Sequence, residues 1–175
     1  MSMKRPNDVI QLDQIHTPIE RNPYAMIAIM DRVGSELSRL LETNLFRHAG
    51  KNWWAKNVLG ILNPDERQKI NTSGSSHLDD FDFHLLLKVL ERNYSFLKAK
   101  LRLPNDGRDL IYEVRQIRNR CIGHRPVRGH DPKQLAHDIK TLESFCATIL
   151  GASVLASEFK ALLQPGPQSE LAVRY

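Results

Sequence analysis

Apolar residues recur every three or four positions along most of this chain of 175 residues, which is the spacing of one face of an α-helix. The first such stripe consists of Met26, Met30, Val33, Leu37, Leu40 and Leu41. It follows Asn22-Pro23, a polar capping residue with a proline in the first helical turn. The pattern predicts a helix that starts near residue 22 and ends near Arg47.

Three later stripes have the same period and predict helices over about residues 80–103, 106–122 and 132–164. We expect Asp79 or Asp80 to cap the first of these and Asp131 the last. Trp53-Trp54 and Asn63-Pro64 open shorter helical segments, and a polar loop, NTSGSS, follows at 71–76. No segment alternates with period two, so the expected fold class is all-α, an antiparallel up-and-down four-helix bundle with short extra helices.

The chain is long enough for one domain with its own core and short for two. Residues 1–21 show no clean period and contain two prolines, and the last residues follow a Pro-Gly-Pro stop. We therefore divide the chain into an N-terminal arm over 1–21, a helical domain over 22–164 and a C-terminal tail over 165–175.

Composition narrows the class of protein only modestly. The net charge of +5 suits a polyanionic partner but also suits plain solubility. No apolar run approaches the roughly 20 residues needed to cross a bilayer, and the N-terminus lacks the apolar stretch of a signal peptide. The only cysteines, Cys121 and Cys146, lie on helical stripes, which favours free thiols and a cytoplasmic location.

The stretch EVRQIRNRCIGHRPVRGH, residues 113–130, concentrates positive charge in one short segment. From Val114 to His130 it holds five arginines and two histidines and no acid. Arginine suits phosphate, because its planar guanidinium donates hydrogen bonds in pairs and stays charged. The segment therefore favours RNA as a partner, although a solvated basic helix end, where cations complement the helix dipole, is the simpler alternative.

Helix geometry separates two of the residues in this segment. Arg120 and His124 are one turn apart and share a polar face with Glu113. Arg118 is six residues from His124, so in an unbroken helix the two point about 120° apart. They meet only if the chain turns at Gly123 or if they come from opposite protomers of a dimer, and both alternatives stay open.

The run from Arg118-Asn119-Arg120 to His124 resembles the HEPN signature, in which four to six residues separate an arginine from a histidine. The Trp53-Trp54 pair, the Asp-rich start of the Leu85–Leu90 helix and the Glu-Val-Arg-Gln-Ile lead resemble the transcript-surveillance (Swt-type) endonuclease branch of that family. The resemblance covers about residues 24–155. It implies a homodimer whose two motifs face each other across a basic cleft, and RNA cleavage without a metal or cofactor.

The resemblance, together with the chemistry of RNA cleavage, suggests roles for individual residues. Histidine near its neutral pKa can move protons, and arginine stabilises charge that develops on phosphate oxygens. We therefore expect His124 to act as general acid or base, Arg118 as the phosphate clamp and Asn119 as an orienting residue. The expected RNA-backbone contacts are Arg115, Arg120, Arg125 and Arg128. Glu113 is expected to tune His124, to hold Arg120, or only to form a surface charge pair.

Other functions fit the same segment. The basic cleft of a HEPN module can bind RNA or a nucleotide without cutting it, or the module can serve only in dimerisation. A toxin or a defence effector is one setting for such an endoribonuclease, and it would add an antitoxin or a larger effector to the expected partners. Zinc is disfavoured, since Cys121 and His124 belong to no closed tetrahedral set of ligands.

Overall fold

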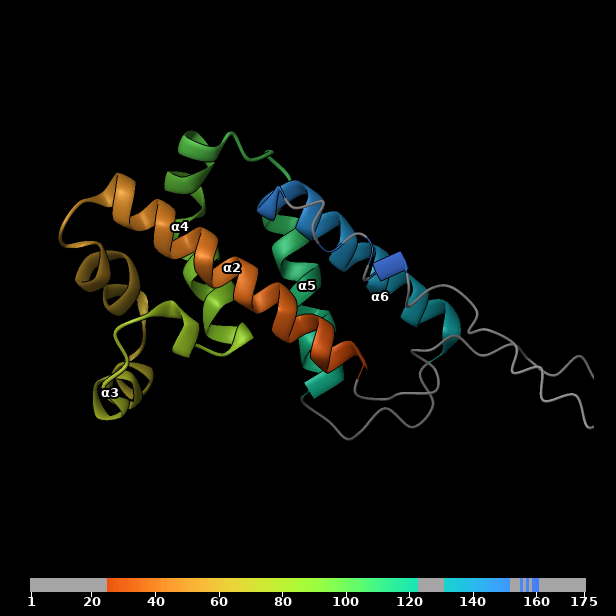
Figure 1. Cartoon of the computed structure of the whole chain (residues 1–175), viewed down its shortest axis with the longest axis horizontal. Helices are drawn as coiled ribbons and strands as arrows, with labels where there is room; N and C mark the ends of the chain where they lie inside the picture. Colours follow the sequence, from red (N-terminus) through yellow and green to blue (C-terminus); the bar gives the residue numbers. More distant parts are fainter. Residues whose placement is uncertain (1–24, 123–130, 152–154, 156, 158, 161–175) are drawn as a thin grey trace, which may run out of the picture.

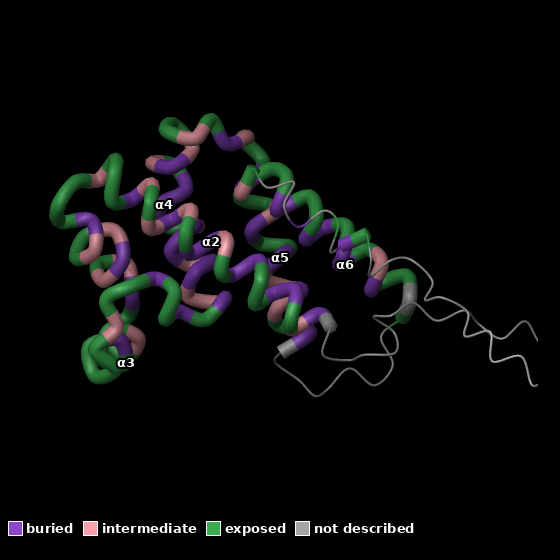
Figure 2. Tube along the Cα trace, in the orientation of Figure 1, coloured by how far each residue is buried: buried purple, intermediate pink, exposed green. Residues whose placement is uncertain are grey.

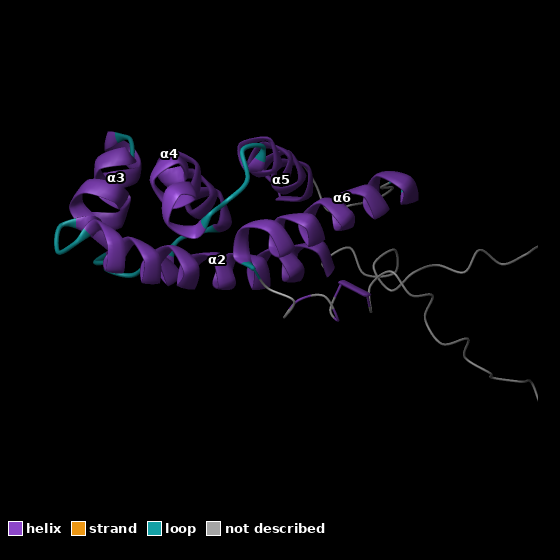
Figure 3. Ribbon diagram, turned by 90° about the horizontal axis from the view of Figure 1, so that it is seen from above, coloured by secondary structure: helices purple, strands orange, loops and turns teal. Residues whose placement is uncertain are grey.

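The computed structural model describes residues 25–122 and 131–151, together with 155, 157, 159 and 160. Every regular element in these ranges is a helix, which confirms the all-α class (Figure 3). No helix in this part of the chain has the length and apolar content to cross a bilayer.

The longest helix, α2 (Ala25–Ala49), is the spine of the fold. Its inward face is fully buried and consists of Met30, Val33, Leu37, Leu41 and Leu45. These positions recur at three- and four-residue spacing, as the sequence predicts, so one continuous stripe packs against α4 and α5. In Figure 3, α2 runs along the molecule and crosses α4 and α5, which are seen more nearly end-on.

Short elements connect α2 to the next long helix. They are η1 (Trp54–Val58), η2 (Leu59–Ile61), α3 (Pro64–Ser73) and η3 (Leu78–Asp80). The indole rings of Trp53 and Trp54 meet edge to face with their centroids 5.4 Å apart, so the two side chains pack on each other. Asn63 caps α3 in a capping box with Glu66, so the predicted start of this segment is confirmed.

The next helix, α4 (Phe83–Leu101), begins later than the sequence predicts. Its N-cap is Asp82, whose side chain accepts a hydrogen bond from the backbone amide of Leu85 at 2.8 Å. The prediction that Asp79 or Asp80 caps this helix is wrong, because both residues belong to the separate turn η3. Three aspartates in four positions give the same capping signal, and sequence spacing alone does not choose among them.

The remaining elements are α5 (Gly107–Ile122), α6 (Pro132–Phe145) and η4 (Cys146–Leu150). Asp131 caps α6 through the amide of Lys133, as predicted. The last predicted helix does not continue unbroken to residue 164, because η4 is a π-helical turn and Gly151 follows it in the left-handed conformation, with φ of 64°. A left-handed glycine is a common helix terminator.

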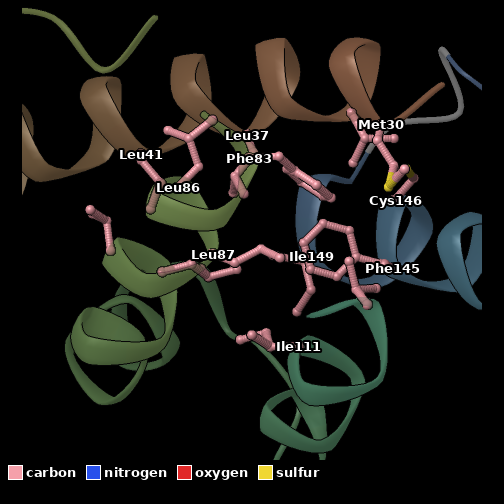
Figure 4. Close-up of a cluster of buried hydrophobic side chains, with 14 of the residues drawn as sticks. Met30, Leu37, Leu41, Phe83, Leu86, Leu87, Ile111, Phe145, Cys146 and Ile149 are labelled. Carbon is pink, nitrogen blue, oxygen red and sulfur yellow. The ribbon is translucent and has the colours of Figure 1, made fainter. Parts of the chain in front are cut away.

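The core lies between α2, α4, α5, α6 and η4 (Figures 2 and 4), and most of its side chains are aliphatic. Figure 4 shows Leu37 and Leu41 of α2 facing Leu86 of α4, while Ile149 and Phe145 approach from the C-terminal elements. This arrangement places the end of α5 next to both α2 and α6. The last turns of α5 reach both neighbours, since Arg118 lines a groove with residues of α2 and Arg120 pairs with Asp138 of α6.

A basic turn at the end of α5

The last two turns of α5 separate an apolar face from a basic one. The buried positions are Ile111, Val114, Ile117 and Cys121, which recur every three or four residues. This face docks on the core and leaves the next positions, Arg118, Asn119 and Arg120, half-buried or exposed. The periodicity that builds the core thus determines which side chains of the motif are accessible.

Arg118 lines a groove of about 1050 Å³ that is formed mainly by α2, η3 and the start of α4. Its terminal nitrogen Nη1 donates a long hydrogen bond, 3.4 Å, to the side-chain oxygen of the neighbouring Asn119. Its Nε is buried and has no hydrogen-bond partner in the described part of the chain. The Arg118 guanidinium therefore lies close to Asn119 and has no hydrogen bond to a carboxylate among the described residues.

The rest of this groove is acidic. Its carboxylates are Asp31, Glu36, Glu42, Asp79 and Asp82. Several of them already have donors: Arg39 for Glu36, His77 for Glu42, Ser38 for Asp79, and the amide of Leu85 for Asp82. The bond to Glu42 also raises the pKa of His77. Because most of the groove repels phosphate, an RNA strand is expected to reach it only at the Arg118 end.

Arg120 points to a different partner. Its Nη2 donates to the Oδ1 of Asp138 on α6 at 2.7 Å, and Gln134 donates to the same oxygen at 2.8 Å. The Asp138 side chain is fully buried, whereas that of Arg120 is 42% exposed. The other carboxylate oxygen, Oδ2, has no hydrogen-bond partner among the described residues. Arg120 therefore ties the end of α5 to α6 through a buried carboxylate.

Asp138 is a residue that sequence reasoning missed. It directly precedes Ile139 on the apolar stripe of α6, and an acid beside a stripe is normally expected to point to solvent. One signal in the sequence could have indicated it. Gln134 and Asp138 are polar residues one turn apart at the edge of that stripe, and the preceding predicted helix is rich in arginine. Only the packing of α6 on α5 shows that this carboxylate is buried.

Arg115 is also paired with an acid. Its Nη2 donates to the Oε2 of Glu91 on α4 at 2.5 Å, and its side chain is 23% exposed. Glu113 is exposed, two turns before Arg120, whose guanidinium is held by Asp138 instead. The predicted RNA contacts of Arg115 and Arg120 and the predicted role of Glu113 stay predictions.

Cys121 takes part in the core rather than in the chemistry of the motif. Burial, followed by the negative charge of Asp138, raises the pKa of its thiol to about 11, so the thiol is neutral at physiological pH. A neutral buried thiol is a poor nucleophile and a poor metal ligand. In the described ranges, no three His, Cys, Asp or Glu side chains are placed to hold a metal ion.

The second half of the motif lies outside the described residues. His124, Arg125 and Arg128 belong to the segment 123–130, and so does Gly123. The predicted turn at Gly123 and the predicted dimer therefore both remain alternatives for bringing His124 to Arg118.

The family model for Swt1-like HEPN domains matches residues 29–149, from the first turns of α2 to η4. The chain belongs to the Swt1-like HEPN family. The match includes the Arg118-Asn119 turn and confirms the resemblance derived from the motif. No curated protein and no solved structure matches the chain in the other two comparisons.

Proposed function

We propose that this Swt1-like HEPN protein is a metal-independent endoribonuclease. The observation that carries the proposal is the state of Arg118 in a HEPN chain. It lines the groove and, unlike Arg115 and Arg120, has no carboxylate partner among the described residues. A phosphate clamp requires a guanidinium that is held near the site but is not neutralised by an acid.

The proposed reaction uses the 2′-hydroxyl of RNA as the nucleophile. His124 acts as general acid or base, taking the proton from that hydroxyl or delivering one to the leaving 5′-oxygen. The new bond joins the 2′-oxygen to phosphorus and the bond from phosphorus to the 5′-oxygen breaks. The products are a 2′,3′-cyclic phosphate and a 5′-hydroxyl. Arg118 stabilises the charge that builds on the phosphorus oxygens, and Asn119 orients the phosphate or the histidine.

The proposal extends to partners and setting. Arg125 and Arg128 are proposed contacts to the RNA backbone, whereas Arg115 and Arg120, which the sequence predicts for the same role, already pair with Glu91 and Asp138. Two copies are proposed to pair so that their motifs face one cleft, in the cytoplasm, with an antitoxin or a larger effector as a further partner. The proposed setting is that of a toxin or a defence effector.

We expect purified protein to cut a mixed RNA substrate in the presence of EDTA and to leave cyclic phosphate ends. Arg118→Ala and His124→Ala should each lower the rate constant by roughly 100-fold or more, since each removes a group that acts in the transition state. Gel analysis of labelled RNA measures the cleavage, and end-group analysis identifies the products.

Arg92→Ala is the matched control, because Arg92 is an exposed arginine on α4 outside the motif and the groove. It should cut RNA like the wild type. Equal cleavage by wild type, Arg118→Ala and His124→Ala would refute the site. Salt-sensitive RNA binding without any cleavage would instead identify a binding module.

A further inference from the structure

We propose that Asp138 is a positioning residue of this site: its buried carboxylate holds the Arg120 guanidinium and thereby fixes the last turn of α5, which carries Arg118 and Asn119. The inference rests on the proposed function, and it assigns Arg120 a role between helices instead of on the RNA. It involves described residues alone, namely Arg118, Asn119 and Arg120 at the end of α5 and Asp138 on α6.

The burial of Asp138 is the first observation behind this inference. A carboxylate with no exposed surface is costly to keep in a helical interface unless a cation and further donors compensate for lost water. Arg120 and Gln134 supply this compensation to one oxygen, at 2.7 and 2.8 Å. An apolar residue of similar size would avoid the cost, so we attribute the pair to orientation and not to stability.

The direction of the side chains is the second observation. Arg118 and Arg120 are two residues apart, so their side chains leave α5 about 200° apart around the helix axis. Arg118 accordingly lines the groove beside α2, while Arg120 reaches α6. Two guanidinium groups that leave the helix on opposite sides do not clamp one phosphate. The pair of Arg120 with Asp138 instead holds the helix in the rotation that directs Arg118 into the groove.

The position of the pair along the chain is the third observation. Arg120 lies in the last described turn of α5, and Asp138 lies in the second turn of α6. The ion pair therefore joins the two helices that flank the segment 123–130, close to the point where α5 ends. A link at this point adds to the core contacts of Ile117 and Cys121, which hold the opposite face of the same turns, and restrains the rotation of the helix end from the side of α6.

The test compares Asp138→Asn, Arg120→Gln, the double variant and Arg118→Ala in the full chain. Asparagine at 138 keeps an oxygen for Arg120 and places its amide at the position of the unpartnered Oδ2, so it removes the charge with little change in shape. Glu66→Gln is the matched control, since it breaks a half-buried ion pair with Lys88 that joins α3 to α4, away from the groove.

Three measurements distinguish positioning from RNA contact. The first is the split between kcat and KM for RNA cleavage in EDTA. The second is the salt dependence of binding to a 2′-O-methyl RNA oligonucleotide, which has no free 2′-hydroxyl and is not cut. The third is the position of the backbone amide signals of Arg118 and Asn119 in nuclear magnetic resonance spectra, which needs no RNA.

We expect Asp138→Asn and Arg120→Gln each to lower kcat by about 10- to 100-fold with little change in KM, and the double variant to be no worse than either single one. Arg118→Ala should reduce the slope of log affinity against log salt by about 0.7, the loss of one phosphate contact on a single strand. Arg120→Gln should leave that slope unchanged. The amide signals should shift in Asp138→Asn and stay in place in Glu66→Gln.

If Arg120→Gln reduced the slope of log affinity against log salt as much as Arg118→Ala does, Arg120 would be a phosphate ligand and the inference would be overturned. It would also be overturned by an Asp138→Asn protein with wild-type kcat and unshifted amide signals, even though the wild type cuts RNA. A wild type that binds RNA without cutting it overturns the proposed cleavage alone, because the slopes and amide signals still decide the role of Arg120. A wild type that neither cuts nor binds RNA overturns both.

Discussion

Tyr94 shows how one side chain joins two helices and the turn between them. It is 2% exposed on α4, and its hydroxyl donates to the backbone oxygen of Pro104 at 2.6 Å. The guanidinium of Arg108 lies 5.8 Å from the ring centroid, within the range of a cation–π contact. Gly107 opens α5 directly against this ring, and a β-carbon there would lie only 2.8 Å from the ring carbon Cζ.

Gly107→Ala should therefore lower the free energy of unfolding by about 1–3 kcal/mol, because the added methyl group overlaps the buried Tyr94 ring and its hydroxyl, which is bonded to Pro104. Gly34→Ala is the matched comparison. It lies inside α2, where a β-carbon would meet Phe83 and Leu86 at ordinary contact distances of 3.6 and 3.7 Å. That variant should gain about 0.5–1 kcal/mol. Urea unfolding measures both changes, and a stable Gly107→Ala protein would contradict the packing described for Tyr94.

The two buried thiols predict a loss of stability in alkali. Burial is the main cause that raises the pKa of Cys121 to about 11 and that of Cys146 to about 12. A raised pKa means that the folded chain holds the proton more tightly than the unfolded chain. The contribution of each thiol to the free energy of unfolding is therefore complete below about pH 9. It is lost as the pH rises toward 11 to 12, by on the order of 1 to 3 kcal/mol for each thiol.

This expectation is checked by measuring the free energy of unfolding between pH 7 and pH 11 for the wild type and for the double variant Cys121→Ala/Cys146→Ala. The double variant starts lower because of the two small cavities, and it should lose less stability between about pH 9 and pH 11 than the wild type does. Parallel curves would show that the thiols do not contribute to the alkaline loss.

At the scale of elements, helix ends decide where the groove lies. Asp82 has an extended conformation, with ψ of 162°, so helix α4 begins at the next residue, Phe83. Phe83 and Leu86 then face α2 and form part of the groove that Arg118 lines. If α4 began at Asp79 or Asp80, as the sequence suggests, η3 would be part of the helix and its contact with α2 would change.

Asp82→Ala should cost about 1 kcal/mol of unfolding free energy, because it leaves the amide of Leu85 without its acceptor. Asp80→Ala should change stability by less than half as much, since Asp80 is exposed and outside the helix. Thermal unfolding of the two variants side by side measures the difference. Equal losses would indicate that the cap is not confined to Asp82.

At the scale of the whole molecule, α2 brings together parts of the chain that are far apart in sequence. It packs against η1, η3, α4, α5 and η4 (Figure 1). The groove beside Arg118 accordingly draws on the first long helix, on the turn before α4 and on the end of α5. Such a site exists only when the elements are docked, whereas the helix that carries Arg118 is visible in the sequence.

The helices were predictable where a local rule has one solution. Asn63-Pro64 and Asp131-Pro132 each offer a single capping residue before a proline, and both starts are confirmed. The rules failed where several residues compete, as at the three aspartates before α4, and where the apolar period continues through a change of helix type, as at η4. Helical period alone does not distinguish a π-turn from a continued α-helix.

Periodicity and capping by themselves determine that the chain is all-α, where most helices begin, and that Arg118 and Arg120 leave α5 on different sides, because these properties depend on residues within a few turns of one another. The surroundings of those arginines beyond their sequence neighbours were decided by tertiary structure alone. Asp138 is buried opposite Arg120, and five carboxylates surround the groove that Arg118 lines, because α6 and α2 dock on α5. Burial and ion pairing between distant segments depend on how the helices pack, which no local pattern encodes.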